Sequence, residues 1–275
     1  MIKTKENNLF YVCQQLYNLY NPLRQTQELY YSLINVLQKY SIDTSIVNIN
    51  NTREIFNNLI LKYYHNEITI KSSFINNVLL KNNDHITIFE LNSGKSRVDL
   101  CKFNGHSIAY EIKTDLDNFN RLKKQINDYL KIFEKVFVIC SVSNVENIKN
   151  NIPDECGIYS YRVSNTGKYI FKKEKNAIKS NNINSKSQLE LFTKLELKKL
   201  FNLKNNSSKI DSINEILTKN NPTKINSIFK QNFKNKYKKN WEFLSNNHEE
   251  ILEIDYQWFF KNNITPSVIY GKSAN

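Results

Sequence analysis

The stretch that decides the fold is Arg97-Val98-Asp99-Leu100, followed after an Asn104-Gly105 turn by Tyr110-Glu111-Ile112-Lys113. Apolar and polar residues alternate along both halves, which is typical of β-strands with one face against a core. Residues two apart on a strand project from the same face, so Glu111 and Lys113 are neighbours on one face. The stretch therefore predicts a β-hairpin that brings two carboxylates and an ammonium close together.

The register of this hairpin decides whether the three charges meet. Asn-Gly most often forms a two-residue turn, which would pair Asp99 with Tyr110 and send Glu111 to the opposite face. The apolar pattern excludes that register, because the apolar side chains of the two strands lie on the same face of the sheet only if the loop has an odd number of residues. A three-residue loop over residues 103–105, with Gly105 in the left-handed conformation, satisfies them. We therefore expect Asp99, Glu111 and Lys113 on the polar face of the sheet.

Two carboxylates in one small volume predict a cation site. At about 4 Å they repel by about 4 kcal/mol at an effective dielectric near 20, unless they share a proton or hold a cation. Oxygen ligands suit Mg²⁺ or Mn²⁺, which acidify a bound water and neutralise charge on a phosphate. Lys113 would stabilise the hydroxide or the phosphate oxygens. The alternative is a solvent-facing sheet with cross-strand charge pairs, and Glu-x-Lys does recur at residues 196–198.

Composition points to a polyanionic partner. The chain has 275 residues and a net charge of +13. Residues 171–240 carry 17 Lys against 5 acidic residues, a net of +12. Nucleic acid is the partner that this charge predicts, and a proteome rich in Lys and Asn is the alternative explanation. The four cysteines show no zinc or disulfide spacing, and we find no signal peptide or membrane-spanning run. We expect a soluble, cytoplasmic protein with no membrane partner.

The pattern along the chain predicts an α/β protein. We expect helices over 9–40, over 52–64 with Thr52 as its cap, and over 74–80. Strands over 85–91, 97–103 and 107–114 follow, then a helix over 118–133 capped by Asp117. A strand over 136–140, a helix over 144–150 and a strand pair over 157–163 and 168–171 complete this part. An Asn/Ser/Lys-rich linker over 174–187 leads to basic helices over 189–203, 211–219 and 223–239. The acidic, aromatic segment 249–262 is expected to fold back onto these helices.

These residues resemble the PD-(D/E)xK nuclease superfamily, with its restriction-endonuclease-like fold, and most closely a poorly characterised bacterial branch of small, repair-like nucleases. The resemblance covers about residues 52–163. It is carried by Glu90-Leu91, Gly94, Arg97-Val98-Asp99, Asn104-Gly105, Tyr110-Glu111-Ile112-Lys113, Asp115, Asp117, Arg121-Leu122, Gln125 and Tyr129. It implies a core of helix, three-stranded meander, helix and strand, in a mixed sheet flanked by helices. The domains would be an N-terminal helical region (1–50), the nuclease-like core (51–173), the linker (174–187) and a basic helical region (188–275).

The resemblance implies a role for each residue of the motif. Asp99 and Glu111 would be metal ligands for Mg²⁺ or Mn²⁺, and Lys113 the catalytic lysine. Glu90 would be the third acid, with Glu54 as its rival. The supporting residues would be Gln125 and Tyr129, which share a helix face, and Thr114, where we would expect Ser. For Tyr129 the alternative is a packing role on the sheet, as part of an amphipathic helix.

The implied activity is metal-dependent hydrolysis of nucleic acid, with DNA as the expected substrate. Contacts to nucleic acid are predicted for Arg97, Arg121, Lys234, Lys236, Lys238 and Lys239. Phe233, Tyr237 and Trp241 would stack on bases, or else form the core of a solvated basic helix. The alternatives are a nucleic-acid-binding protein without catalysis on the same fold, and a non-enzymatic interaction protein. Superfamily nucleases are often dimers, so a homodimer stays open.

Overall fold

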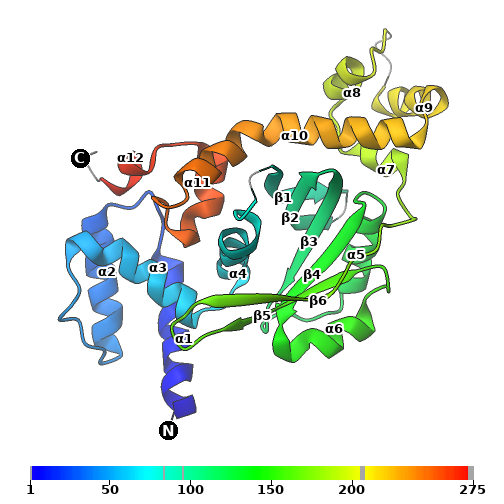
Figure 1. Ribbon diagram of the computed structural model, residues 1–275. Helices are drawn as coiled ribbons and strands as arrows, with labels where there is room; N and C mark the ends of the chain where they lie inside the picture. Colours follow the sequence, from blue (N-terminus) through cyan, green and yellow to red (C-terminus); the bar gives the residue numbers. More distant parts are fainter. Residues whose placement is uncertain (1, 83, 95, 205–207, 272–275) are drawn as a thin grey trace. The chain divides into compact units, whose positions relative to one another are not determined.

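The computed structural model describes residues 2–82, 84–94, 96–204 and 208–271 (Figure 1). The protein is of the α/β class, with a six-stranded mixed sheet and flanking helices. The chain forms two compact units. Unit 1 comprises Met1–Lys81, Arg162–Phe171 and Glu242–Asn275, and unit 2 comprises Asn82–Tyr161 and Lys172–Trp241.

The sheet follows the order of the sequence, β1-β2-β3-β4-β5-β6. Its strands are β1 (Ile86–Ser93), β2 (Ser96–Asn104), β3 (His106–Lys113), β4 (Lys135–Ser141), β5 (Gly157–Val163) and β6 (Tyr169–Lys175). The pairs β1–β2 and β2–β3 are antiparallel, whereas β4 runs parallel to both β3 and β5. A strand in such a parallel pairing is covered on both faces, which explains the continuous apolar run of β4. All six strands were predicted along the chain, whereas their order in the sheet was not.

The predicted odd number of loop residues between β2 and β3 is confirmed, but the loop consists of Gly105 alone and not of residues 103–105. Phe103 pairs with Ser107 and Asn104 with His106, so Gly105 forms the turn. Gly105 has φ +62°, as predicted. Phe103, expected in the loop, is instead a fully buried residue of β2. This register places residue 99 opposite residue 111.

Helix α5 (Leu122–Leu130) connects β3 to β4 and packs on β2 and β4. The prediction that Asp117 caps a helix from residue 118 is wrong. The Asp117 carboxylate accepts hydrogen bonds from the backbone N–H and the hydroxyl of Thr114, so it closes a turn at the end of β3. After β4, η3 (Val142–Asn144) and α6 (Val145–Asn151) lead to β5, as predicted.

Unit 1 begins with three helices packed around an apolar core that includes Leu16, Leu33 and Phe56. The helices are α1 (Ile2–Leu19), α2 (Thr26–Lys39) and α3 (Thr52–Tyr63). The single helix expected over 9–40 is interrupted, because Pro22 cannot continue a helix. Thr52 is not a cap. Its hydroxyl donates to the carbonyl of Asn48, whose side chain caps the short η1 (Ile49–Asn51) before α3.

Unit 1 also contains helix α4 (Glu67–Phe74), which continues into a π-helix, η2 (Ile75–Leu79). Its last elements are η4 (Glu253–Asp255), α11 (Tyr256–Asn262) and α12 (Pro266–Tyr270). Residues 249–262, which could fold back onto the basic helices, belong to unit 1, where η4 packs on α3 and α4. The Asp255 carboxylate is 2% exposed and accepts hydrogen bonds from the hydroxyls of Tyr20 and Tyr270. Burial raises the pKa of Asp255 to about 6.

The basic helices are α7 (Ser185–Glu190), α8 (Lys194–Leu200), α9 (Lys209–Lys219) and the long α10 (Pro222–Asn247) (Figure 1). The stretch 174–187, predicted as a linker, contains the end of β6 and the start of α7. This stretch and the residues that follow it, up to Trp241, fall in unit 2. No described helix is long and apolar enough to cross a membrane.

Candidate active site

The backbone pairing between β2 and β3 ends next to Asp99 and Glu111, two of the predicted site residues. The last paired residues are Leu100 and Tyr110, and beyond them the Asp99 carboxylate accepts a hydrogen bond from the backbone N–H of Ile112 at 2.7 Å. The Asp99 side chain thus accepts the hydrogen bond of a backbone N–H that would otherwise pair with a carbonyl of the neighbouring strand. The bond fixes Asp99 beside the strand that carries Glu111 and Lys113.

Glu111 and Lys113 form an ion pair inside unit 2. Lys113 Nζ lies 2.8 Å from Glu111 Oε1 and 3.1 Å from Gln125 Oε1. Asp99, Glu111 and Lys113 are 7%, 2% and 8% exposed. The predicted polar face is therefore covered, and the alternative of a solvent-facing charge pattern is wrong. Burying charged groups is costly unless they are paired.

Tyr129 ties the cluster to α5. Its hydroxyl lies 2.8 Å from Glu111 Oε2 and 2.8 Å from the Arg97 carbonyl. A phenol has one proton, so it can donate fully to only one of these two acceptors at a time. Burial, reinforced by Glu111, raises the pKa of Tyr129 and keeps it a donor. Gln125 and Tyr129 thus both contact the charged cluster, as their i, i+4 spacing predicted.

Lys113 is held in its charged form. Burial alone lowers the pKa of this ammonium, but the carboxylates of Glu111, Asp99 and Asp117 outweigh burial and raise it. Asp117, predicted as a helix cap and named among the residues that carry the resemblance, is therefore an additional charge near the cluster. Thr114, predicted as a supporting residue, is buried and acts through its two hydrogen bonds to Asp117.

The two candidates for a third acid lie in different units. Glu90 of β1 occupies the position opposite Asp99, between the pairs Phe89–Leu100 and Leu91–Val98. Its φ of +53° is unusual for a residue in a strand, and such strain is frequent at functional sites. Glu90 Oε1 lies 3.7 Å from the Arg97 guanidinium. Glu54 belongs to α3 in unit 1.

The donor set was tested for a divalent metal. Within the part of the chain that the structure describes, no group of three or more His, Cys, Asp or Glu side chains is arranged to hold a metal ion. Asp99 and Glu111 fit the other common mode, in which Mg²⁺ is held by one or two carboxylates plus waters and substrate phosphates. Glu111 would then exchange the Lys113 ammonium for the metal at Oε1.

The predicted nucleic-acid contacts all belong to unit 2. Arg97, Arg121, Lys236, Lys238 and Lys239 are exposed and Lys234 is half-buried. Lys236 is paired with Glu196 at 2.9 Å.

Of the three aromatic residues of α10 that were predicted to stack on bases, two are core residues. Phe233 stacks on Phe103 of β2 with ring centres 5.6 Å apart, and Trp241 packs on His85. Both are 2% exposed, so the hypothesis that Phe233 and Trp241 stack on bases is wrong. The alternative, that they belong to a core, is confirmed.

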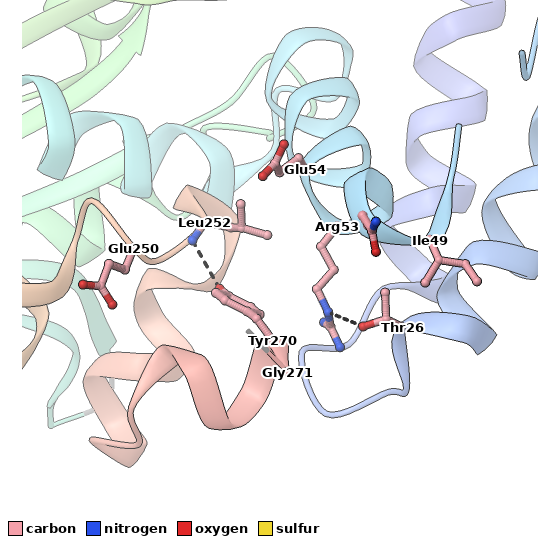
Figure 2. A pocket seen from close by; sticks show the side chains of 9 residues that line it. Thr26, Ile49, Arg53, Glu54, Glu250, Leu252, Tyr270 and Gly271 are labelled. Carbon is pink, nitrogen blue, oxygen red and sulfur yellow. Dashed lines mark hydrogen bonds between the residues drawn. The ribbon is translucent and has the colours of Figure 1, made fainter. Parts of the chain in front are cut away.

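A separate cavity of about 470 Å³ lies in unit 1 (Figure 2). Glu54, Glu250 and the buried Arg53 line it. Arg53 donates to Thr26 Oγ1 and to the Arg24 carbonyl and lies over the ring of Tyr270. No residue of the Asp99 cluster lines this cavity.

Residues 61–257, well over half of the chain, match the family model described as "Bacteriophage P4 protein cII". The chain belongs to the bacteriophage P4 protein cII family. The matched residues include Glu90, Asp99, Glu111 and Lys113 but not Glu54. A curated relative, "Protein cII" of Enterobacteria phage P4, is 30% identical over 106 residues. That alignment covers 38% of this chain and 40% of the relative, so the chain spans well under half of that relative's length. No solved structure matches the chain.

Proposed function

We propose that this protein is a divalent-metal-dependent nuclease of the PD-(D/E)xK type, with DNA as its expected substrate. The observation that carries the proposal is the buried cluster of Asp99, Glu111 and Lys113. Buried charges are retained in few places, and active sites are one of them. The sheet order β1-β2-β3, then α5, then β4 supports a restriction-endonuclease-like core.

In this proposal Asp99 and Glu111 hold the cation and Tyr129 orients Glu111. The bound cation would acidify a water and neutralise charge on the scissile phosphate. Lys113 stays protonated, because its pKa is raised, and its ammonium stabilises the attacking hydroxide or the phosphate oxygens. Gln125 accepts a hydrogen bond from Lys113 and holds it near the cluster.

Glu90 is the preferred third acid. It lies in the same unit as Asp99 and within the residues that match the family. Glu90 is also paired with Arg97. Because Arg97 is exposed, its guanidinium can exchange the Glu90 carboxylate for a phosphate of the substrate.

Cleavage of plasmid, linear and single-stranded DNA, and of RNA, tests the proposal. Mg²⁺ or Mn²⁺ should support cutting and EDTA should stop it. Asp99→Ala and Lys113→Ala should each abolish cutting while leaving salt-sensitive binding largely intact. Asp154→Ala, which removes an exposed acid of unit 2, is the matched control and should cut normally. Cutting that persists in Asp99→Ala or Lys113→Ala would refute the assignment of the site.

A second candidate is a nucleic-acid-binding protein on the same fold that does not cut. The ion pair between Lys113 and Glu111 favours it, because the lysine already neutralises the carboxylate that a metal needs. This candidate predicts steep salt dependence of DNA binding and no cleavage with either metal.

A further inference from the structure

A polar cavity of unit 1 has a volume of about 590 Å³, within the usual range for small-molecule sites. Its lining residues come from α3, the end of α4 with the π-helix η2, the β5–β6 turn with the start of β6, and η4. The lining residues used below are Asn57, Asn58, Lys62, Asn76, Asn77 and Lys168.

One wall is a π-helix, which is rare and frequently marks a functional site. The backbone N–H of Leu80 donates to the carbonyl of Ile75, five residues earlier. The wider turn carries Asn76 and Asn77, which both line the cavity. The side-chain amide of Asn77 donates to the Ser73 carbonyl, which helps to hold this irregular segment in place.

The β5–β6 turn, which also lines the cavity, contains a glycine that lies close to α3. Gly167 has φ +83°, and a Cβ at this position would lie 3.0 Å from the Lys62 side chain. Only glycine therefore lets the β5–β6 turn lie this close to α3 without displacing Lys62. The contact places Lys62 and Lys168 on the rim of one cavity.

The charges of the cavity favour an anion. In the described part of the chain neither Lys62 nor Lys168 is paired with an acid. The one acidic lining residue, Glu253, accepts hydrogen bonds from Ser73 Oγ and Asn76 Nδ2. The 470 Å³ cavity is different, because two carboxylates line it and its one arginine is buried against Tyr270.

We propose that the 590 Å³ cavity binds a nucleoside phosphate, either a free nucleotide or the phosphorylated end of a strand. Lys62 and Lys168 take the phosphate as compact cations. Amide side chains offer both donors and acceptors, which is what the edge of a base requires. The site belongs to unit 1 and uses no residue of the Asp99 cluster, so it is independent of the proposed nuclease activity.

Calorimetric titration of the full chain with the four nucleoside 5′-monophosphates, in EDTA, tests this proposal. At least one nucleotide should bind saturably and more tightly than inorganic phosphate. Lys62→Ala, Lys168→Ala and Asn77→Ala should each weaken it about tenfold. Lys39→Ala, at an exposed lysine of α2, should not. Because EDTA prevents cleavage, the outcome does not depend on the nuclease proposal.

The source of the phosphate is separated by fluorescence anisotropy with an oligonucleotide that carries either a 5′-phosphate or a 5′-hydroxyl. If strand ends are the ligand, the 5′-phosphate should increase affinity in the wild type and not in Lys62→Ala. If free nucleotides are the ligand, the two oligonucleotides should bind alike while the monophosphate still binds. The proposal is overturned if no probe binds saturably, if phosphate alone binds as tightly, or if Lys62→Ala and Lys168→Ala bind like the wild type.

Discussion

Replacing Lys113 with Met should lower the free energy of unfolding, because the buried carboxylates lose their counter-charge. The change keeps a long side chain but removes the ammonium 2.8 Å from Glu111 Oε1. At that distance the attraction is about 6 kcal/mol at an effective dielectric near 20. Part of it is offset, because the variant no longer buries a lysine charge. Breaking one side of a buried pair typically costs about 3–5 kcal/mol, and we expect a loss in that range.

A divalent cation should replace the missing charge. Mn²⁺ stabilises a folded protein by mass action, by about 2.7 kcal/mol at 100 times its Kd. In the wild type Mn²⁺ competes with Lys113 for Glu111, whereas in Lys113→Met it does not. The gain in stability with Mn²⁺ should therefore be larger in the variant.

Urea unfolding at neutral pH, with and without MnCl₂, measures both effects. Lys123→Met is the matched control, because Lys123 is an exposed residue of the helix that carries Gln125. It should lose little stability and show the same Mn²⁺ gain as the wild type. The reasoning fails if Lys113→Met loses less than about 1 kcal/mol. It also fails if Mn²⁺ stabilises the variant and the wild type equally.

Three further predictions concern stability. Tyr129→Phe leaves buried acceptors without their donor and should cost about 1–3 kcal/mol in urea unfolding; an unchanged midpoint would contradict this. The folded pKa of Asp255 is raised from 3.8 to about 6, so its stabilising contribution is present below pH 4 and is lost as the pH rises through 6. The stability of the wild type minus that of Asp255→Asn should thus fall by about 3 kcal/mol from pH 3.5 to 7, and a flat difference would argue against a buried, titrating Asp255. Phe233→Ala should cost about 3–5 kcal/mol as a core residue. A base-stacking residue would instead lower DNA affinity at unchanged stability.

The strands could be predicted because alternation along β2 and β3 records which face packs on the core. The same apolar pattern decided the odd loop at Gly105 against the commoner two-residue turn. It could not reveal that α5 covers the charged face, since that depends on tertiary packing. The sequence therefore left open whether Asp99, Glu111 and Lys113 were solvated, and only the structure shows them buried.

A local hydrogen bond explains one error, and packing between residues far apart in sequence explains another. Asp117 has the right position for a helix cap, but Thr114 offers it two donors within its own turn. Aromatic spacing along α10 suits both base stacking and core packing, and Phe233 packs on Phe103, which is far away in sequence. The π-helix η2 left no sequence signal that we used, because it differs from an α-helix only in its hydrogen-bond pattern.

Titration of Mn²⁺ into the full chain by calorimetry tests the central claim most directly, because it asks whether Asp99 and Glu111 hold a cation. We predict saturable binding to the wild type that is lost in Asp99→Asn and in Glu111→Gln and retained in Asp154→Asn. Binding that is the same in all four proteins, or absent from the wild type, would contradict the proposed metal site.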